Sequence, residues 1–168
     1  EGRRACYEPT GEREKLKDYS NNEQEYDVWR CDFAADGYRF PTEAEWEYAS
    51  RAGSSGSFCF GSDEDLLPQY DWFVVNAKSR AWPGGARLPN AVGLFDMHGN
   101  VCEWCWDWLG DYPAEPASDP TGANGGSARV IRGGSFRLDA DWGHSTYRSR
   151  LQPMYSSTEN GFRVCCGR

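Results

Sequence analysis

The sequence predicts one compact domain, residues 1–168, that combines a helix with several short strands around an aromatic core and long ordered loops. A chain of 168 residues is long enough for one hydrophobic core. Aromatic residues make up 15% of it and glycines number 19, whereas leucine, isoleucine and valine are few. That composition is unlike a helical bundle or a doubly wound sheet, since aliphatic side chains dominate both.

Charge and hydropathy exclude several classes of function. The net charge of −8 argues against non-specific nucleic-acid binding and against docking on an anionic membrane. No apolar run approaches bilayer-spanning length and no secretory signal opens the chain, so membrane insertion is not expected. The chain begins at Glu1 without an initiator methionine, so we expect a processed product or an excised fragment, with cytoplasm and cell surface both open as its location.

The N-terminal segment 1–22 is polar and charged, and we expect an irregular arm that crosses the surface. Cys6 and Cys31 stand at the ends of an excursion whose centre, residues 12–27, must face solvent because it is nearly all polar. A Cys6–Cys31 disulfide would add about 3 kcal/mol by restricting the unfolded chain. Two reduced thiols, as in a cytosolic protein, fit the sequence equally well.

The clearest helix lies within residues 38–53. Thr42 is the expected N-cap, Glu45 completes a T-x-x-E capping box, and Gly53 ends the helix. We expect two neighbouring apolar rows on one side and a solvated acidic face. The rows are Trp46 with Ala49 and Ala44 with Tyr48, and the acidic face is Glu43, Glu45 and Glu47.

The stretch 90–108, NAVGLFDMHGNVCEWCWDW, is the expected centre of the domain. Gly99 and Asn100 predict a turn because both tolerate positive φ, and from Val101 onward side chains should alternate between two faces of a strand. Glu103 then lies among large apolar groups and needs a partner, because an unpaired buried carboxylate is costly.

The sequence allows two kinds of partner for Glu103, an arginine or a calcium ion. Arg132 and Arg163 both lie within predicted strands, and either could form a salt bridge with it. Alternatively, Glu103 is a calcium ligand, with the side-chain oxygen of Asn100 and a nearby carbonyl completing a site made of oxygens.

The C-terminal half predicts two strands and one long loop. Residues 128–136 form a strand that ends in Gly133-Gly134, which indicates a bulge or a close backbone approach. Residues 161–166 form the last strand. The loop at 110–127 is rich in Pro, Asp and Gly, and a loop of that length is usually functional or pinned by contacts.

Cys102 and Cys105 have the C-x-x-C spacing of metal and redox motifs. In a strand, positions i and i+3 point to opposite faces, so a shared metal is disfavoured. A four-thiolate zinc site would need Cys165 and Cys166 alongside them.

Five blocks of sequence resemble the formylglycine-generating enzyme (sulfatase-modifying factor) family. They are GYRFPTEAEWEYASRAG, PNAVGLFDMHGNVCEWCWDW, DPTG, RVIRGGSF and NGFRV, and they occur in the family's order between residues 6 and 164. The resemblance implies an α+β class, the C-type-lectin-like fold of this family, with little regular secondary structure and long loops. We expect the family's first strand and helix, which precede the GYR block, to be missing.

In this family the GNVxEW turn helps to hold a calcium ion, so the resemblance implies structural calcium here. The matching ligands are Asn100 and Glu103 through their side chains and Val101 through its backbone oxygen. Asn90 and Asp96 are near in sequence but are not expected to be ligands.

The family's enzymes oxidise a sulfatase cysteine to formylglycine with molecular oxygen, using copper held by two cysteines just after the RGGSF block. Here no cysteine lies between Ser135 and Val164. Without thiolates, copper(I) has no soft ligands there. We therefore expect no copper, no catalytic residue and no formylglycine-generating activity.

Residues 132–164 also resemble the variable region of proteins that retroelements diversify. Those proteins vary a ligand-binding surface on the same lectin-like scaffold, between an RGGS block and a closing GFRV block. The residues at the matching positions of this chain suit a binding face, because they include Trp, Tyr and Arg, the residue types that dominate binding hot spots. Alternatively, the residues at these positions are ordinary loop residues of a paralogue that is not diversified. The matching positions are Arg137, Leu138, Asp139, Asp141, Trp142, Tyr147, Ser149, Arg150, Leu151, Gln152, Met154 and Tyr155.

Three functions follow from these observations. The first is a catalytically silent module that binds a protein or another macromolecule through residues 137–155. The second is a metal-dependent oxidase of the family, with a site built from residues such as His98, His144 and Asp141, which their spacing does not unite. The third is a structural domain attached to a larger protein, for example beside a kinase.

Overall fold

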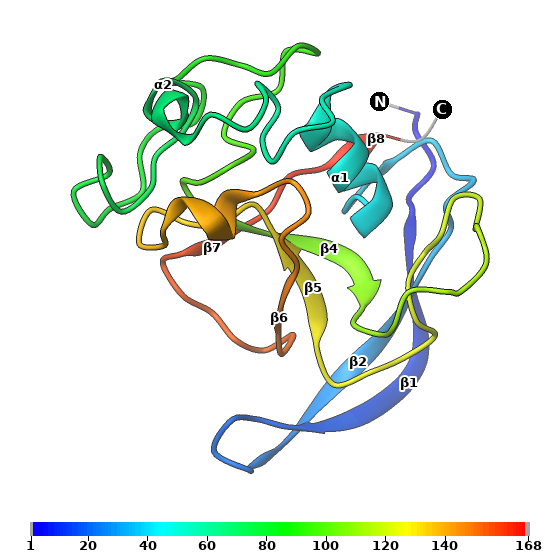
Figure 1. Ribbon diagram of the computed structural model, residues 1–168. Coiled ribbons are helices and arrows are strands. Elements are labelled where there is room, and N and C mark those ends of the chain that lie inside the picture. The colour runs from blue at the N-terminus through cyan, green and yellow to red at the C-terminus, as the bar shows by residue number, and fades with distance from the viewer. Residues whose placement is uncertain (1, 167–168) are drawn as a thin grey trace.

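A four-stranded sheet lies at the centre of the chain, with helix α1 above it and a long hairpin protruding below (Figure 1). The computed structural model describes residues 2–166. The sheet has the order β6-β5-β4-β7. Strands β4 (Cys102–Trp108), β5 (Arg129–Arg132) and β6 (Ser149–Leu151) are antiparallel, and β7 (Asn160–Gly161) runs parallel to β4.

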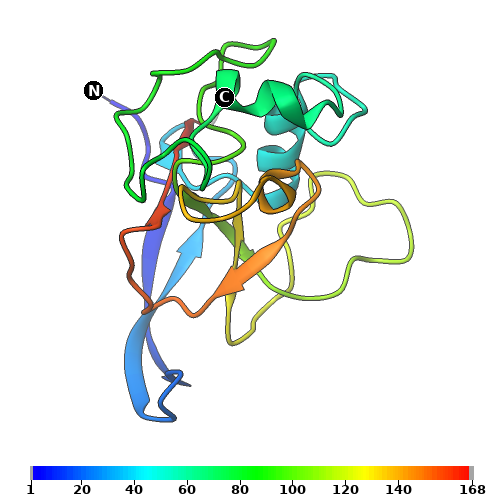
Figure 2. The ribbon, with the colours of Figure 1, turned by 60° about the vertical axis from the view of Figure 1, so that its left-hand side comes forward.

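The other elements are short and surround this sheet (Figure 2). Helix α1 (Glu43–Arg51) contacts β4 and β5. Strand β3 (Tyr38–Arg39) pairs antiparallel with β8 (Cys165–Cys166). The remaining helices are η1 (Glu64–Leu66), α2 (Leu67–Tyr70) and η2 (Ala140–Gly143). This mixture of short elements and long loops confirms the expected α+β class.

The irregular N-terminal arm is a wrong prediction. Strands β1 (Tyr7–Lys17) and β2 (Glu23–Cys31) form an antiparallel hairpin. Both faces of most of the hairpin meet solvent, so no alternation of apolar residues marks its strands. Cross-strand ion pairs stabilise the pairing instead, as where Arg13 contacts both Glu25 and Asp27 at 2.9 Å.

The capping box of α1 is confirmed. The Glu45 N–H donates to Thr42 Oγ1 at 3.2 Å, and the Thr42 N–H donates to Glu45 Oε2 at 2.8 Å. Ala52 ends the helix in the left-handed conformation, and Gly53 follows at φ +89°. The N-terminal capping box and the end of the helix near Gly53 therefore both form as the sequence predicts.

The predicted faces of α1 are partly wrong. Trp46 is buried, but Tyr48 of the second apolar row is 84% exposed. Glu43, expected on a solvated face, is only 4% exposed. It is buried because Arg132 and Arg148 lie beside its carboxylate.

Strand β4 separates two environments, as its alternation predicts. One face points toward α1 and is buried, and the opposite face is aromatic and half-buried. The buried face contributes to a core cluster of Trp46, Met97, Cys105 and Val130. The two faces consist of Glu103, Cys105 and Asp107 on one side and Trp104, Trp106 and Trp108 on the other.

The strand predicted at 128–136 is present as β5, and the close approach at its end is confirmed. Gly133 has φ +93°, and a Cβ there would lie 3.0 Å from the Trp46 ring. The last strand is interrupted, however, because pairing moves from β4 at Gly161 to β3 at Cys165. Phe162 and Val164 are exposed between the two short strands.

All seven cysteines are free thiols, so Cys6 and Cys31 are not joined. The four-thiolate zinc site is wrong, since no group of three or more His, Cys, Asp or Glu side chains suited to a metal occurs among residues 2–166. The pairing of β8 with β3 places Cys165 and Cys166 on a different sheet from the C-x-x-C motif. Within the same residues, no helix has the length and apolarity needed to cross a bilayer.

Candidate functional site

The twelve residues predicted as a ligand-binding face all lie at the surface, on and around η2 and β6. None is buried. The segment begins just after Phe136, whose N–H donates to the Asn100 carbonyl at 2.8 Å. A rigid turn therefore anchors its start. Exposed members are Arg137, Asp139, Asp141, Trp142, Arg150, Met154 and Tyr155, and half-buried members are Leu138, Tyr147, Ser149, Leu151 and Gln152.

Aromatic rings within this face touch one another and the hairpin. The rings of Trp142 and Tyr147 have centroids 4.8 Å apart, and Trp142 is 39% exposed. Tyr155 meets Tyr19 of the hairpin turn edge-on at 5.7 Å. Gln152 Nε2 donates to the Lys17 carbonyl at 2.5 Å. The hairpin thus borders one end of the face and extends it.

Glu103 is paired with an arginine, and the arginine is Arg163. The Arg163 Nε and Nη2 donate to the two carboxylate oxygens at 2.5 and 2.8 Å. The Trp46 indole Nε1 donates to the same carboxylate at 2.7 Å. Arg132 lies opposite Glu103 in the sheet, but it makes its ion pairs with acidic residues of α1. Of the two predicted partners, only Arg163 forms the salt bridge.

The predicted calcium ligands line one cavity of about 390 Å³. The side-chain amide of Asn100 forms two hydrogen bonds with the backbone of Trp82. Its Oδ1 accepts from the Trp82 N–H at 3.0 Å, and its Nδ2 donates to the Trp82 carbonyl at 3.1 Å. Asp96 lines the same cavity, and its buried Oδ1 has no hydrogen-bond partner in the part of the chain that the structure describes. The oxygens fit a hard cation in part, because Asp96 Oδ1 is free while Glu103 is neutralised by Arg163. Calcium at Asn100, Val101 and Glu103 stays a prediction.

We expect about one equivalent of calcium by mass spectrometry of the purified chain. A chelator should lower the melting temperature by several degrees, because a bound ion at about 100 times its Kd adds about 2.7 kcal/mol to stability. Asp96→Asn should reduce that sensitivity, whereas Asp111→Asn, on the exposed loop, should not. A chelator-insensitive melt without bound calcium would contradict the site.

The residues considered for an oxidase metal site serve other roles. Burial lowers the pKa of His98 to about 4, so this imidazole is neutral near pH 7. Its Nδ1 bonds to the Gly143 carbonyl at 2.8 Å and its Nε2 accepts from the Cys59 N–H at 3.0 Å, which leaves neither nitrogen free for a metal. His144 packs edge-on against Phe58, as His98 does, and its Nε2 lies 3.7 Å from Asp141 Oδ1.

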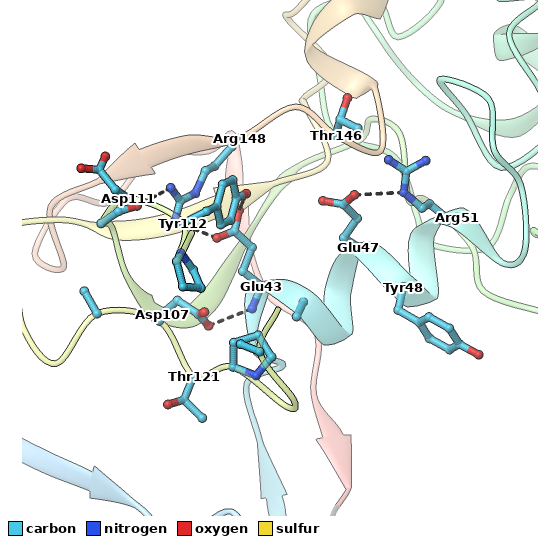
Figure 3. A pocket seen from close by; sticks show the side chains of 17 residues that line it. Glu43, Glu47, Tyr48, Arg51, Asp107, Asp111, Tyr112, Thr121, Thr146 and Arg148 are labelled. Atoms are coloured by element: carbon cyan, nitrogen blue, oxygen red, sulfur yellow. Dashed lines mark hydrogen bonds and ion pairs between the residues drawn. The ribbon is translucent and has the colours of Figure 1, made fainter. Parts of the chain in front are cut away.

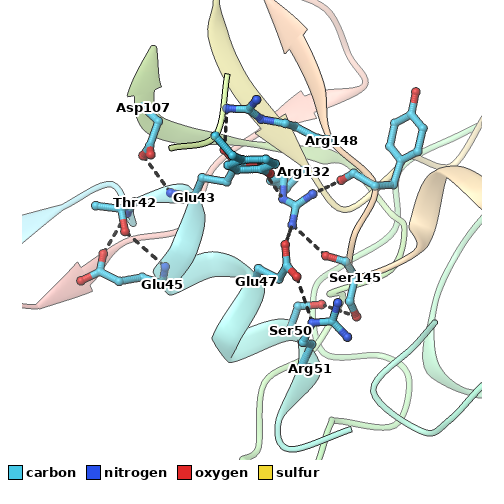
Figure 4. A network of polar contacts seen from close by, with 12 residues as sticks. Thr42, Glu43, Glu45, Glu47, Ser50, Arg51, Asp107, Arg132, Ser145 and Arg148 are labelled. Atoms are coloured by element: carbon cyan, nitrogen blue, oxygen red, sulfur yellow. Dashed lines mark hydrogen bonds and ion pairs between the residues drawn. The ribbon is translucent and has the colours of Figure 1, made fainter. Parts of the chain in front are cut away.

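A buried network of charges joins α1 to the end of β5 (Figure 4). Arg132 is fully buried and donates to Glu47 and to the carbonyls of Ser145 and Tyr147. Glu43 lies 3.7 Å from its Nε. This network fixes the middle of the predicted ligand face, because both carbonyls belong to the segment between η2 and β6.

A cleft of about 870 Å³ opens beside this network, between α1 and the 110–127 loop (Figure 3). Arg148 Nη2 contacts Glu43 at 2.8 Å, and the Tyr112 hydroxyl donates to Glu43 at 2.9 Å. Asp107 accepts from the Glu43 N–H at 2.8 Å. The loop is therefore pinned to the helix, as its length predicts. Desolvation raises the pKa of Asp107 to about 6, and the nearby Glu43 charge adds to the shift.

The raised pKa of Asp107 predicts a pH-dependent stability. A carboxyl group whose folded pKa exceeds its unfolded value favours folding below the unfolded pKa, near 4, and this contribution is lost as pH rises through about 6. Asp107→Asn keeps an oxygen for the Glu43 N–H, so the variant should be about 1–2 kcal/mol more stable than wild type at pH 7, after discounting for solvent screening. The two should converge at pH 4 in urea unfolding. A difference independent of pH would contradict the shift.

Sequence reasoning missed three features of these sites. Glu43 and Asp107 are buried carboxylates whose partners come from distant segments, and Asp96 is a half-buried carboxylate with an unpartnered buried Oδ1 among the described residues. No spacing in the sequence marks these environments. The one signal in the sequence for such a buried carboxylate was at Asp107, which stands between two tryptophans. The same pattern, an acidic residue among large apolar ones, had marked Glu103 as buried.

Comparison with known proteins agrees with this geometry. The profile of the sulfatase-modifying factor enzyme 1-like domain matches residues 14–167. The formylglycine-generating enzyme of Streptomyces coelicolor is 38% identical over 150 residues, covering 76% of this chain and 46% of that enzyme. The serine/threonine-protein kinase pkn1 of Chlamydia pneumoniae is 34% identical over 132 residues, covering 76% of this chain and 20% of the kinase. Among solved structures, Treponema denticola variable protein 1 matches with a TM-score of 0.80 and 36% identity, over 83% of this chain and 51% of that one. The chain thus spans about half of the length of two of these proteins and a fifth of the kinase.

Proposed function

The chain belongs to the sulfatase-modifying factor enzyme 1-like domain family and has the C-type-lectin-like fold of formylglycine-generating enzymes, and from this premise we propose that it is a catalytically silent binding module. Its ligand is a protein or another macromolecule. The binding face consists of the surface residues of segment 137–155, on and around η2 and β6.

The observation that carries this proposal is that none of the twelve predicted face residues is buried, on a scaffold that is otherwise tightly held. Phe136 anchors the start of the segment, Arg132 holds its middle, and the hairpin turn contacts its end. Side chains held by such a scaffold lose little entropy on binding. The likeness to Treponema denticola variable protein 1 supports the same assignment.

The distribution of thiols supports catalytic silence. The family's copper site needs two cysteines after the RGGSF block, and that segment contains none. The donor set there, with Asp139, Asp141 and His144, does not fit copper(I), which prefers soft thiolates. Elsewhere, burial raises the pKa of Cys31 to about 11 and that of Cys102 to about 12, which keeps both thiols protonated near pH 7.

Trp142→Ala should weaken ligand binding and leave the fold nearly intact. The Trp142 side chain is 39% exposed, so we expect a loss of stability below about 1 kcal/mol. Clones selected from a displayed library of small protein domains against the wild-type chain should bind Trp142→Ala at least about tenfold more weakly, as for a hot-spot aromatic. Tyr38→Ala, an exposed aromatic of β3 outside the face, is the matched control. Selected clones that bind both variants like wild type would refute the face.

Catalytic silence is tested with a cysteine peptide from a sulfatase. With copper(I) supplied, we expect no conversion of the peptide cysteine to an aldehyde by mass spectrometry and no oxygen uptake above the copper blank. A formylglycine-generating enzyme under the same conditions is the positive control. Aldehyde formation would contradict catalytic silence and support the oxidase hypothesis.

The second candidate function is an accessory domain of a larger protein. The similarity to kinase pkn1, of which the match covers only 20%, favours it because related domains occur inside multidomain chains. This role is compatible with a binding face. Whether retroelements diversify the face is tested by sequencing many copies of the gene, where substitutions should concentrate in the twelve face codons.

A further inference from the structure

Arg129 of β5 is a half-buried cation that no acidic side chain neutralises within residues 2–166. Its guanidinium carbon lies 3.8 Å from the ring centroid of Trp108 and 4.6 Å from that of Trp106. Nη1 donates to the Trp106 carbonyl. No other hydrogen bond of this guanidinium is found among the described residues, and its Nε and Nη2 are not fully enclosed. Burial lowers the pKa of Arg129 to about 10, so the charge remains near pH 7.

The guanidinium borders a cleft of about 750 Å³ between the sheet and the hairpin. Trp106 and Trp108, from the aromatic face of β4, line one side of it. Tyr7, Tyr26 and Trp29 line the other side from the hairpin. Tyr7 stacks on Trp106 at 5.4 Å, which fixes the hairpin against the sheet. The rim also includes Thr121, Ala123, Asn124, Gly125 and Pro153.

We propose that this Trp–Arg cleft, defined by Arg129, Trp106, Trp108 and Tyr26, binds a small organic carboxylate with a flat apolar body. The guanidinium presents parallel N–H donors that match a carboxylate, and in a partly desolvated site such a pair is strong. The flat part of the ligand lies against aromatic rings, which favour stacking.

The charges around the cleft favour a monoanion over a phosphate dianion. Among the described residues, Arg129 is the one cation lining the cleft that lacks an acidic partner, since Arg30 is paired with Glu8 at 3.1 Å. Glu14 and Asp27 also line the cleft and would repel a second negative charge. A single carboxylate matches one guanidinium fork.

The cleft is separate from the proposed ligand face. None of the twelve face residues lines it, and Pro153 is the sole member of segment 137–155 that does. It also lies on the opposite face of β4 from α1 and its buried charges. The inference therefore does not rest on the proposed function.

Calorimetric titration with 1-naphthoate and indole-3-acetate tests the inference, with their uncharged amides as matched probes. We expect saturable binding of at least one carboxylate, at least about tenfold weaker binding of its amide, and shifts of the Trp106 and Trp108 indole N–H signals in NMR spectra. Arg129→Gln should weaken carboxylate binding at least about tenfold. Trp142→Ala should leave it unchanged, which separates this test from that of the ligand face.

A second variant keeps the test decisive if Arg129→Gln fails to fold. Asn124→Asp adds a negative charge to an exposed position of the cleft rim and should weaken carboxylate binding several-fold. Gln69→Glu adds the same charge on α2, away from the cleft, and should have no effect. The inference is overturned if no carboxylate binds, if the amides bind equally well, or if Asn124→Asp and Gln69→Glu behave alike.

Discussion

Replacing Arg132 with leucine is expected to lower the free energy of unfolding by about 3–5 kcal/mol, the cost of removing one member of a buried ionic network. Arg132 is fully buried, and it supplies donors to Glu47 and to the carbonyls of Ser145 and Tyr147. Leucine fills part of the volume but removes the donor of both carbonyls and leaves Glu47 with Arg51 as its ion-pair partner. The loss should appear as a lower midpoint in urea unfolding with an unchanged slope.

Arg137→Leu is the matched control for this experiment. Its side chain is 55% exposed and its ion pair with Glu159 spans 3.7 Å, so the same change there should cost less than about 1 kcal/mol. Equal losses for the two variants would show that burial does not decide the importance of Arg132. Arg132→Leu should also loosen the proposed ligand face, because Ser145 and Tyr147 belong to the segment that carries it.

The second large effect is expected for Glu103→Ala, at about 2–4 kcal/mol of stability. The substitution removes the partner of Arg163 and leaves the Trp46 indole N–H buried without an acceptor. Glu103→Gln should cost less, because one acceptor remains. Glu115→Ala, on the exposed loop, is the control and should be close to neutral.

Two further measurements decide why Glu103 matters. In a double-mutant cycle with Arg163→Met, the two substitutions should be strongly non-additive, because either one breaks the same salt bridge. The loss caused by Glu103→Ala should persist in the presence of a chelator if Arg163 is the main partner, and should vanish there if calcium is. An unchanged melting temperature for Glu103→Ala would contradict the buried position of this carboxylate.

The sequence alone was sufficient wherever the deciding interaction is local. The Thr42–Glu45 capping box forms between residues three apart, and the alternation of β4 follows from the two-residue period of a strand. The two glycines after β5 were likewise predicted to mark a close approach, which the Trp46 ring confirms. The five blocks that resemble formylglycine-generating enzymes identified the family and the fold, and residues 14–167 match it.

The tertiary structure decided everything that depends on which segments meet. The hairpin has no apolar period because both its faces meet solvent, so only the pairing of its opposite charges across two strands distinguishes it from an irregular arm. Glu103 pairs with Arg163 rather than with Arg132, because acidic residues of α1 form ion pairs with Arg132. Arg129 is an ordinary strand residue in the sequence, and among the described residues it lacks an acidic partner because the fold places two tryptophan rings against it. The two carboxylates of the cleft, Glu14 and Asp27, contact Tyr26 and Arg13 of the hairpin instead. Long-range electrostatic pairing is set by three-dimensional proximity, and a linear pattern does not contain it.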